Sequence, residues 1–337
     1  MMKLHTHIFY YWATVILSVF VFCGSCAQDH KKNNMKRPIE QLYTSVDSLD
    51  YPTMSQYFVE GYQSGCFYEI YINDVLVFKH YENVGLMNHA TPINDMILKS
   101  GTQKVTVKLF PLGKIDDQEF TTIDADARFR LKIYKRDKKQ PYEALGYDVV
   151  KEYFAPTVSG ERGGAFLNAG IPYYEETFTF EAKVPYELKG WSESQVLTEL
   201  DQKELEQGIL DFYNEYDDVI QKQDEKKWVE MVRKRELEYL KSVHYNDFKN
   251  SKIKSRIDYF ISVFDSDFVE EFPLDIYKIK LEGNGKLAVL KSTERKGKAA
   301  YSFGVKIERN GKYRKVRRSK HLYLHKPKGS NKLEIIR

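Results

Sequence analysis

The sequence is poor in cysteine, proline and glycine for its length, with 3 Cys, 10 Pro and 19 Gly among 337 residues. So little cysteine excludes a scaffold held by many disulfides, and so little proline and glycine excludes a collagen-like or low-complexity chain. Aromatic residues are abundant, at 14%, which excludes a chain that is disordered throughout. Because domains typically contain about 150 residues, the length predicts two of them.

Charge is absent from a long stretch near the N-terminus. No Asp, Glu, Lys or Arg occurs between Lys3 and Asp29, and residues 8–23 are almost entirely apolar. A basic start followed by an apolar core and small residues is typical of a secretory signal peptide, which we predict over residues 1–25. Export would place the folded part outside the cytoplasm and leave Cys66 as its single cysteine.

The end of this stretch, Cys23-Gly24-Ser25-Cys26, resembles the lipobox of bacterial lipoproteins, with Cys23 where that family usually has leucine. The resemblance implies that Cys26 carries lipid, such as palmitate, and anchors the chain in the membrane of a Gram-negative-type envelope, facing the periplasm or the cell surface. Two alternatives stay open. One is an uncleaved anchor helix, which needs about 20 apolar residues, and the other is a soluble secreted protein cleaved near Ala27.

Residues 26–50 are polar and predict a tether, with a short helix over residues 39–49. Residues 51–192 then predict an antiparallel β-sandwich, because short alternating segments are joined by polar loops. The expected strands are Phe67–Ile72, Val75–His80 after an Asn73-Asp74 turn, and residues 104–110, 128–135 and 176–184.

Two segments of this region have further interpretations. Residues 93–110 resemble a stretch of immunoglobulin-like and jelly-roll modules, in which a leucine, a basic residue and a glycine precede a strand; the resemblance implies the sandwich fold. Residues 153–174 are rich in glycine and aromatics, and they are either an exposed recognition loop or an ordinary crossover between strands.

Helical spacing replaces alternation near residue 192. It predicts helices over residues 198–222 and 225–244 and a third that ends near Asp265. Strands follow to the C-terminus, including a hairpin at Asn310-Gly311 and closing strands over residues 321–325 and 333–336. Helices followed by antiparallel strands over residues 193–337 resemble the NTF2-like fold, a curved sheet wrapped around a helix. The predicted fold class is therefore mixed: a β-sandwich, then an α+β domain.

The NTF2-like resemblance implies a cone that can hold a small ligand. Candidate lining residues are Tyr216, Trp228, Tyr301 and Phe303, although aromatic residues at helical spacing more often form a core. His321 and His325 would lie about 13 Å apart along a strand, too far to share a metal. The sequence has no HExxH and no Gly-x-Ser-x-Gly motif, and we predict neither a cofactor nor a metal site.

Charge is unevenly distributed along the chain. Residues 285–337 contain 17 Lys or Arg and 3 Glu, a balance of +14, whereas residues 26–284 have a balance of −11. Eleven acidic residues lie within residues 193–225. Either the two regions neutralise each other, or a basic surface meets an acidic partner; that surface would consist of Lys312, Arg314, Lys315, Arg317, Arg318 and Lys320.

These patterns favour a non-enzymatic, lipid-anchored envelope protein that binds a partner. The partner would be a protein or an acidic surface, since an exported chain rarely meets nucleic acid. Neutralisation of a toxin and an accessory role in an envelope complex are two forms of this hypothesis. The alternative is a small-molecule enzyme or ligand-binding protein that uses the NTF2-like cone.

Overall fold

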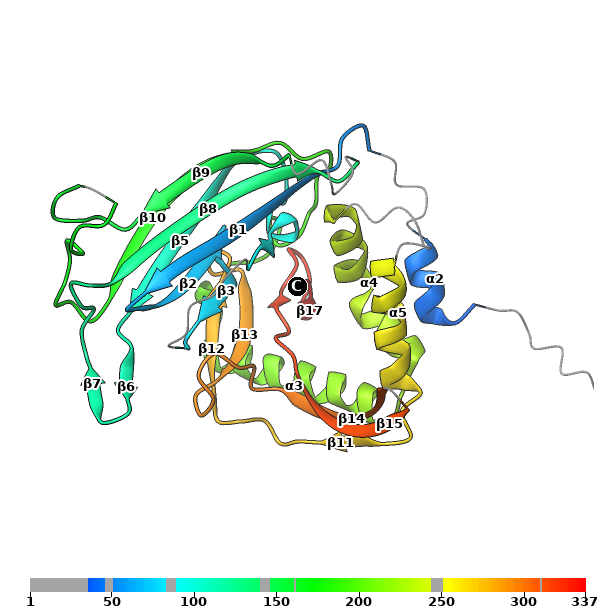
Figure 1. Ribbon diagram of the computed structural model, residues 1–337. Coiled ribbons are helices and arrows are strands. Elements are labelled where there is room, and N and C mark those ends of the chain that lie inside the picture. The colour runs from blue at the N-terminus through cyan, green and yellow to red at the C-terminus, as the bar shows by residue number, and fades with distance from the viewer. Residues whose placement is uncertain are drawn as a thin grey trace, which may run out of the picture. The chain divides into compact units, whose positions relative to one another are not determined.

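Strands dominate the N-terminal half of the described chain and helices its middle, so the fold is mixed, as predicted (Figure 1). The computed structural model describes residues 36–45, 51–82, 89–139, 146–160, 162–243, 251–309 and 311–337. The predicted signal peptide, Cys26 and most of the predicted tether lie outside these residues.

The N-terminal sheets, our name for the two four-stranded antiparallel sheets of the first half, each have a non-sequential strand order. The first contains β4 (Thr91–Pro92), β1 (Ser55–Ser64), β8 (Arg128–Asp137) and β9 (Asp148–Phe154), in that order. The second contains β10 (Tyr174–Ala182), β5 (Gly101–Phe110), β2 (Phe67–Ile72) and β3 (Val75–His80). A small hairpin, β6 (Gly113–Ile115) and β7 (Gln118–Phe120), follows β5.

Local sequence signals placed β2, β3, β5, β8 and β10 within a few residues of the prediction. Asn73 and Asp74 have positive φ angles of 50° and 65°, as a tight two-residue hairpin turn requires. Strands β1 and β9 were not predicted from the sequence pattern. The reason is that β1 mixes polar and apolar residues and is defined by its ten-residue pairing with β8, while β9 lies at a sheet edge and is largely exposed.

Both N-terminal sheets contribute to one hydrophobic core. Val59 and Leu131 come from the first sheet, and Ile70 and Val107 from the second; each is at most 1% exposed. Along β8 the residues alternate between buried and partly exposed, with Phe129 on the core side. The arginines at positions 128 and 130 therefore lie on the outer face of the sheet.

Four α-helices are described. They are α2 (Pro38–Thr44), α3 (Gln202–Gln221), α4 (Glu225–Ser242) and α5 (Ser251–Phe264), with short 3-10 turns η1 (Asn94–Met96) and η3 (Leu197–Glu199). The Asp201 carboxylate caps α3 by accepting hydrogen bonds from the backbone N–H groups of Lys203 and Glu204, and Asp224 caps α4 in the same way.

Helix α2 lies within the segment that the sequence predicted as a tether, and it is part of the core. Ile39, Leu42 and Tyr43 are fully buried among the residues of α3, α4 and α5. The Tyr43 hydroxyl donates a hydrogen bond of 2.6 Å to Glu236 on α4. The spacing of these three residues, i, i+3 and i+4, forms one apolar helix face that a tether would leave in water.

The C-terminal strands form two further sheets. One contains β11 (Val269–Glu271), β14 (Ser302–Arg309) and β15 (Lys312–Ser319), and the other contains β12 (Tyr277–Glu282), β13 (Leu287–Ser292), β16 (Leu324–His325) and β17 (Glu334–Ile335). Strands β14 and β15 form the hairpin predicted at Asn310-Gly311. The last two strands are shorter than predicted.

Strand β13 connects the helical core to the core of the N-terminal sheets. All six of its residues are buried. Ala288 and Leu290 belong to the core that contains the helices, whereas Leu287 and Val289 belong to the core of the N-terminal sheets. Because neighbouring residues of a strand face opposite sides, this continuous apolar run packs on both, and Pro38–Arg337 form one compact unit.

A buried charged cluster lies beside this contact. Glu282, 1% exposed, accepts hydrogen bonds from Lys291 at 2.5 Å and from the backbone N–H of Leu76 on β3 at 2.9 Å. Lys280 donates to the hydroxyl of Tyr71, which donates to Glu69. The cluster thus joins β12 and β13 to β2 and β3 through ion pairs and hydrogen bonds.

Candidate functional site

The four predicted cone residues are packed in the helical core. Tyr216, Trp228, Tyr301 and Phe303 are each at most 4% exposed. The Trp228 indole N–H donates to the Tyr216 hydroxyl at 3.0 Å, and the Tyr301 hydroxyl donates to Asp217 at 2.8 Å. Burial raises the pKa of both tyrosines. Their rings fill the interior, and none of the four lines the cavities described below.

The predicted basic residues lie on β15 and just after it, and strand alternation divides them between the two faces of the hairpin. Lys315 lies over the ring of Phe268 at 3.9 Å and Arg317 over Phe272 at 4.3 Å. Arg318 and Lys320 lie over Tyr259 of α5. The six residues therefore do not form one continuous surface, and Arg317 is already paired with Asp275 at 3.3 Å.

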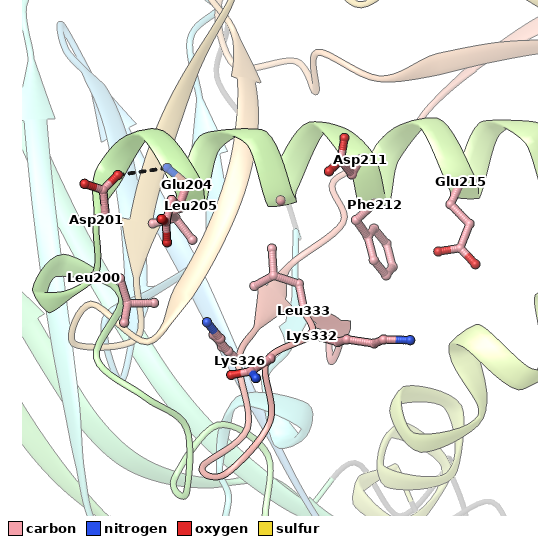
Figure 2. Close-up of a pocket in the computed structure, with 12 residues that line it drawn as sticks. Leu200, Asp201, Glu204, Leu205, Asp211, Phe212, Glu215, Lys326, Lys332 and Leu333 are labelled. Carbon is pink, nitrogen blue, oxygen red and sulfur yellow. Dashed lines mark hydrogen bonds between the residues drawn. The ribbon is translucent and has the colours of Figure 1, made fainter.

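A cavity of about 500 Å³ lies between α3 and the turn that joins β16 to β17. Figure 2 shows Phe212 and Glu215 pointing from α3 toward this turn, and Leu333 pointing back toward the helix. Lys326 and Lys332 lie on the turn. The cavity thus has one wall from a helix and one from a turn far away in sequence.

The α3 wall is acidic because its carboxylates recur at helical spacing. Asp201, Glu204, Asp211 and Glu215 all line the cavity, and their offsets of three, seven and four residues place them on one side of the helix. Gly208 lies in the middle of this row, and a Cβ atom there would lie 3.6 Å from Leu333. A larger side chain at Gly208 would therefore extend across the cavity toward Leu333.

The turn wall is fixed by the segment that precedes α3. The Gln195 side-chain amide donates to the carbonyls of Pro327 and Ser330 at 2.8 and 2.9 Å. Ser194 forms a β-bridge with Pro327. The turn is therefore held in place before any ligand binds, which lowers the entropy cost of binding there.

A second cavity, of about 630 Å³, continues the first toward α4. The two share Phe212, Glu215, Lys332 and Leu333, so together they form one groove, which we call the α3–α4 groove. Apolar side chains of Met231 and Leu237 extend its floor. Charged residues of both signs line the α4 part: Lys227, Glu230, Arg233, Lys234 and Glu334.

His325 lies buried beside this second part. Its Nδ1 is 2.7 Å from the Ser194 hydroxyl, and its Nε2 is 3.5 Å from the Lys234 ammonium. Burial and the charge of Lys234 lower the pKa of His325 to about 4. The ring is neutral at pH 7 and accepts from Lys234, so Glu334, 3.7 Å away, has no imidazolium to pair with.

The described residues contain no group of three or more His, Cys, Asp or Glu side chains placed to hold a metal ion. Within the same ranges, none of the helices combines the length and hydropathy of a membrane span. Comparison of the chain with protein-family models, curated proteins and solved structures finds no match.

The sequence contains a signal for the acidic wall of the groove. The helical spacing of Asp201, Glu204, Asp211 and Glu215 places these four residues on one side of α3. The opposite wall could not be predicted, because residues 326–333 reach α3 only through the fold.

Proposed function

We propose that this chain is an exported, lipid-anchored envelope protein that binds another protein in the α3–α4 groove. The leader and the lipobox-like sequence ending at Cys26 support export and anchoring. The continuity of the two cavities through Phe212, Glu215, Lys332 and Leu333 carries the binding proposal. A long groove with an apolar floor and charged walls has the features of a site that receives an amphipathic segment.

The charges of the walls define the partner segment. It carries an apolar ridge for Phe212 and Leu333, basic side chains toward the α3 carboxylates, and acidic side chains toward Lys326 and Lys332. Glu204, Lys326 and Lys332 form no ion pair with another described residue, so each is available to a partner. Neutralisation of a toxin and an accessory role in an envelope complex are both consistent with this mode of binding.

The finer fold assignments are part of the same proposal. A β-sandwich for the N-terminal sheets is supported by the core that both sheets share. An NTF2-like domain for residues 193–337 is supported by helices followed by antiparallel strands. The alternative function, a small-molecule site in the cone, is disfavoured because Trp228 packs on Phe260 at 4.4 Å between ring centres, and Tyr216 on Tyr301 at 5.8 Å.

Site-specific crosslinking in the native membrane tests the groove. A photoreactive benzophenone amino acid at Asn331, an exposed residue of the groove, should give an adduct, whereas the same group at exposed Lys183 should not. Gly208→Leu, which fills the groove, and Glu204→Lys, which reverses its charge, should each abolish the Asn331 adduct. Equal adduct yield in both variants would refute the groove as the binding site.

Mass spectrometry of the N-terminal peptide tests the anchor separately. Cleavage before Cys26 and acyl chains on that residue are expected, and Cys26→Ser should release the protein from the membrane. An unmodified Cys26 in the mature chain would refute lipid anchoring while leaving the groove proposal intact.

A second candidate surface is the hairpin of β14 and β15, which could hold the chain against anionic headgroups. The observation that favours it is the outer face of the hairpin, where Tyr313 is 66% exposed and Lys306 lies over its ring at 4.5 Å. In the Cys26→Ser chain, the double variant Lys306→Glu, Lys315→Glu, whose positions are cross-strand partners on the same face as Tyr313, should sediment less with phosphatidylglycerol vesicles at low salt. Unchanged sedimentation would remove this surface.

A further inference from the structure

A separate cavity of about 350 Å³ lies at one end of the first of the N-terminal sheets. Its lining comes from the end of β1, the start of β8 and the segment where β9 leads into the following loop. This loop lies within residues 153–174, which were predicted as either a recognition loop or a crossover. Tyr62, Arg130 and Phe154 are cross-strand neighbours on β1, β8 and β9. They share one face, so the cavity has a base built from three paired strands.

Aromatic rings provide most of the walls. The Arg130 guanidinium lies 5.0 Å from the Tyr62 ring centre and 5.7 Å from that of Phe154. Arg162, on the loop, lies over Phe154 at 4.2 Å. Phe166, which is 2% exposed, lines the cavity where the loop returns to the sheet. The cavity thus combines flat apolar surfaces with guanidinium groups held next to them.

The loop that forms one side of the cavity is fixed by its backbone. Phe166 donates its N–H to the Ala125 carbonyl at 2.8 Å, and Val158 donates to Ala165 at 2.9 Å. At Gly164 a Cβ atom would lie 2.3 Å from the Ser159 hydroxyl oxygen, so a side chain there would displace that hydroxyl. The site is therefore formed in advance of binding, as in most small-molecule pockets.

Positive charge exceeds negative charge around the cavity. Arg130 and Arg162 share one carboxylate, Glu152, at 3.0 and 3.8 Å. Arg128 donates only to the backbone carbonyls of Ala125, Ala127 and Gly163. Glu60 is hydrogen-bonded to the lining residue Tyr62, so among the described residues three guanidinium groups face two carboxylates.

One donor of this set is unused. The Nε of Arg130 is buried and has no hydrogen-bond partner in the described structure. A buried donor without an acceptor is costly, so Glu152 alone does not satisfy the Arg130 guanidinium.

We propose that this cavity binds a small organic anion, with an apolar or aromatic body against Tyr62, Phe154 and Phe166 and a carboxylate at Arg130 and Arg162. The volume lies near the lower end of the roughly 300–1,000 Å³ typical of ligand pockets, which favours a small molecule over a protein segment. The site is distinct from the α3–α4 groove, so it adds a ligand to the proposed function and does not depend on it.

Three probes with the same phenylbutyl body test the charge requirement. Phenylbutyrate, phenylbutanol and phenylbutylamine are titrated into the full chain by calorimetry at low ionic strength. The acid should bind at least about tenfold more tightly than the alcohol, because charge-assisted hydrogen bonds to guanidinium are lost, and the amine should bind most weakly. Equal binding of acid and alcohol, or no binding of any probe at millimolar concentration, would overturn the proposal.

Variants then locate the site. Arg162 has a side chain that is 74% exposed, so Arg162→Gln should fold normally and weaken phenylbutyrate binding by about tenfold, with partial recovery in Arg162→Lys. Lys183→Gln removes one positive charge from the same region outside the cavity and should bind like the wild type. Gly208→Leu should also leave phenylbutyrate binding unchanged. An unchanged affinity in Arg162→Gln, or an equal loss in Lys183→Gln, would overturn the assignment to this cavity.

Discussion

The C-terminal region, residues 193–337, contains buried ion pairs beside exposed ones such as Lys222–Asp218, whereas the ion pairs described within the N-terminal sheets are all partly or largely exposed. In the C-terminal region the pairs Glu236–Arg256, Glu282–Lys291 and Glu238–Arg337 have carboxylates that are 0%, 1% and 12% exposed. In the N-terminal sheets the pairs Arg130–Glu152, Lys108–Glu175 and Lys135–Asp148 have side chains that are 26–79% exposed.

This difference separates two uses of charge. Buried pairs in the C-terminal region hold elements together, since Glu236 joins α2, α4 and α5 through Tyr43 and Arg256, and Glu282 joins β12 to β3. The ion-paired charges of the N-terminal sheets, such as Arg130 and Glu152, are partly exposed and available to a ligand. Removing a charge should therefore cost stability in the first region and alter binding in the second.

The largest effect is expected at Glu236. Burial raises its pKa, but Arg235 and Arg256 outweigh burial and hold that pKa at about 2, so the carboxylate is charged at pH 7. Glu236→Gln leaves both arginines without their partner and should lower the free energy of unfolding by about 3–5 kcal/mol. The urea midpoint measures this, and hydrogen exchange of α2 should rise with it.

Glu152→Gln is the matched control, because it makes the same chemical change at a partly exposed pair of the N-terminal sheets. It should cost at most about 1 kcal/mol. Similar losses in Glu236→Gln and Glu152→Gln would break the comparison between the two regions.

A smaller effect is expected for the Glu282–Lys291 pair. Glu282→Gln leaves Lys291, 7% exposed, without its carboxylate and should cost about 3 kcal/mol. Replacing both residues by methionine should restore much of that loss, because no buried charge is then left unpaired. Urea unfolding of the single and double variants gives the values; a double variant no more stable than the single one would show that the pair itself is stabilising.

The smallest effect is a pH dependence that arises at His325. The unfolded histidine, with a pKa near 6.5, takes up a proton as the pH falls, whereas the folded histidine, with a pKa of about 4, does not. Stability is therefore full above about pH 6.5 and declines toward pH 4, by about 2 kcal/mol between pH 7 and pH 5. His325→Gln should remove that part of the decline.

Urea midpoints at pH 7 and pH 5 measure this change. His321→Gln serves for comparison, because burial and nearby lysines also lower the pKa of His321 to about 4. If His325→Gln loses as much stability as the wild type over this range, the buried ring is not a source of the acid sensitivity.

Local patterns in the sequence determined a large part of the secondary structure. Helical spacing located α3, α4 and α5, and Asn73-Asp74 and Asn310-Gly311 located two hairpins, because a helix face or a tight turn depends on residues near each other in the chain. Periodicity in the sequence predicts the mixed fold class. The sequence alone also shows the uneven charge and predicts the signal peptide, which supports the proposed location in the envelope.

Tertiary structure decided what long-range packing controls. The aromatic residues Tyr216, Trp228 and Tyr301 form part of the hydrophobic core and do not line a pocket. The reason is that rings from several elements pack together and fill the interior. Strand β1 is defined by its pairing with β8. Helix α2, which lies within the predicted tether, belongs to the core because three of its side chains pack among those of α4 and α5. The α3–α4 groove and the arginine-lined cavity likewise join segments distant in sequence, and no local pattern records which segments meet.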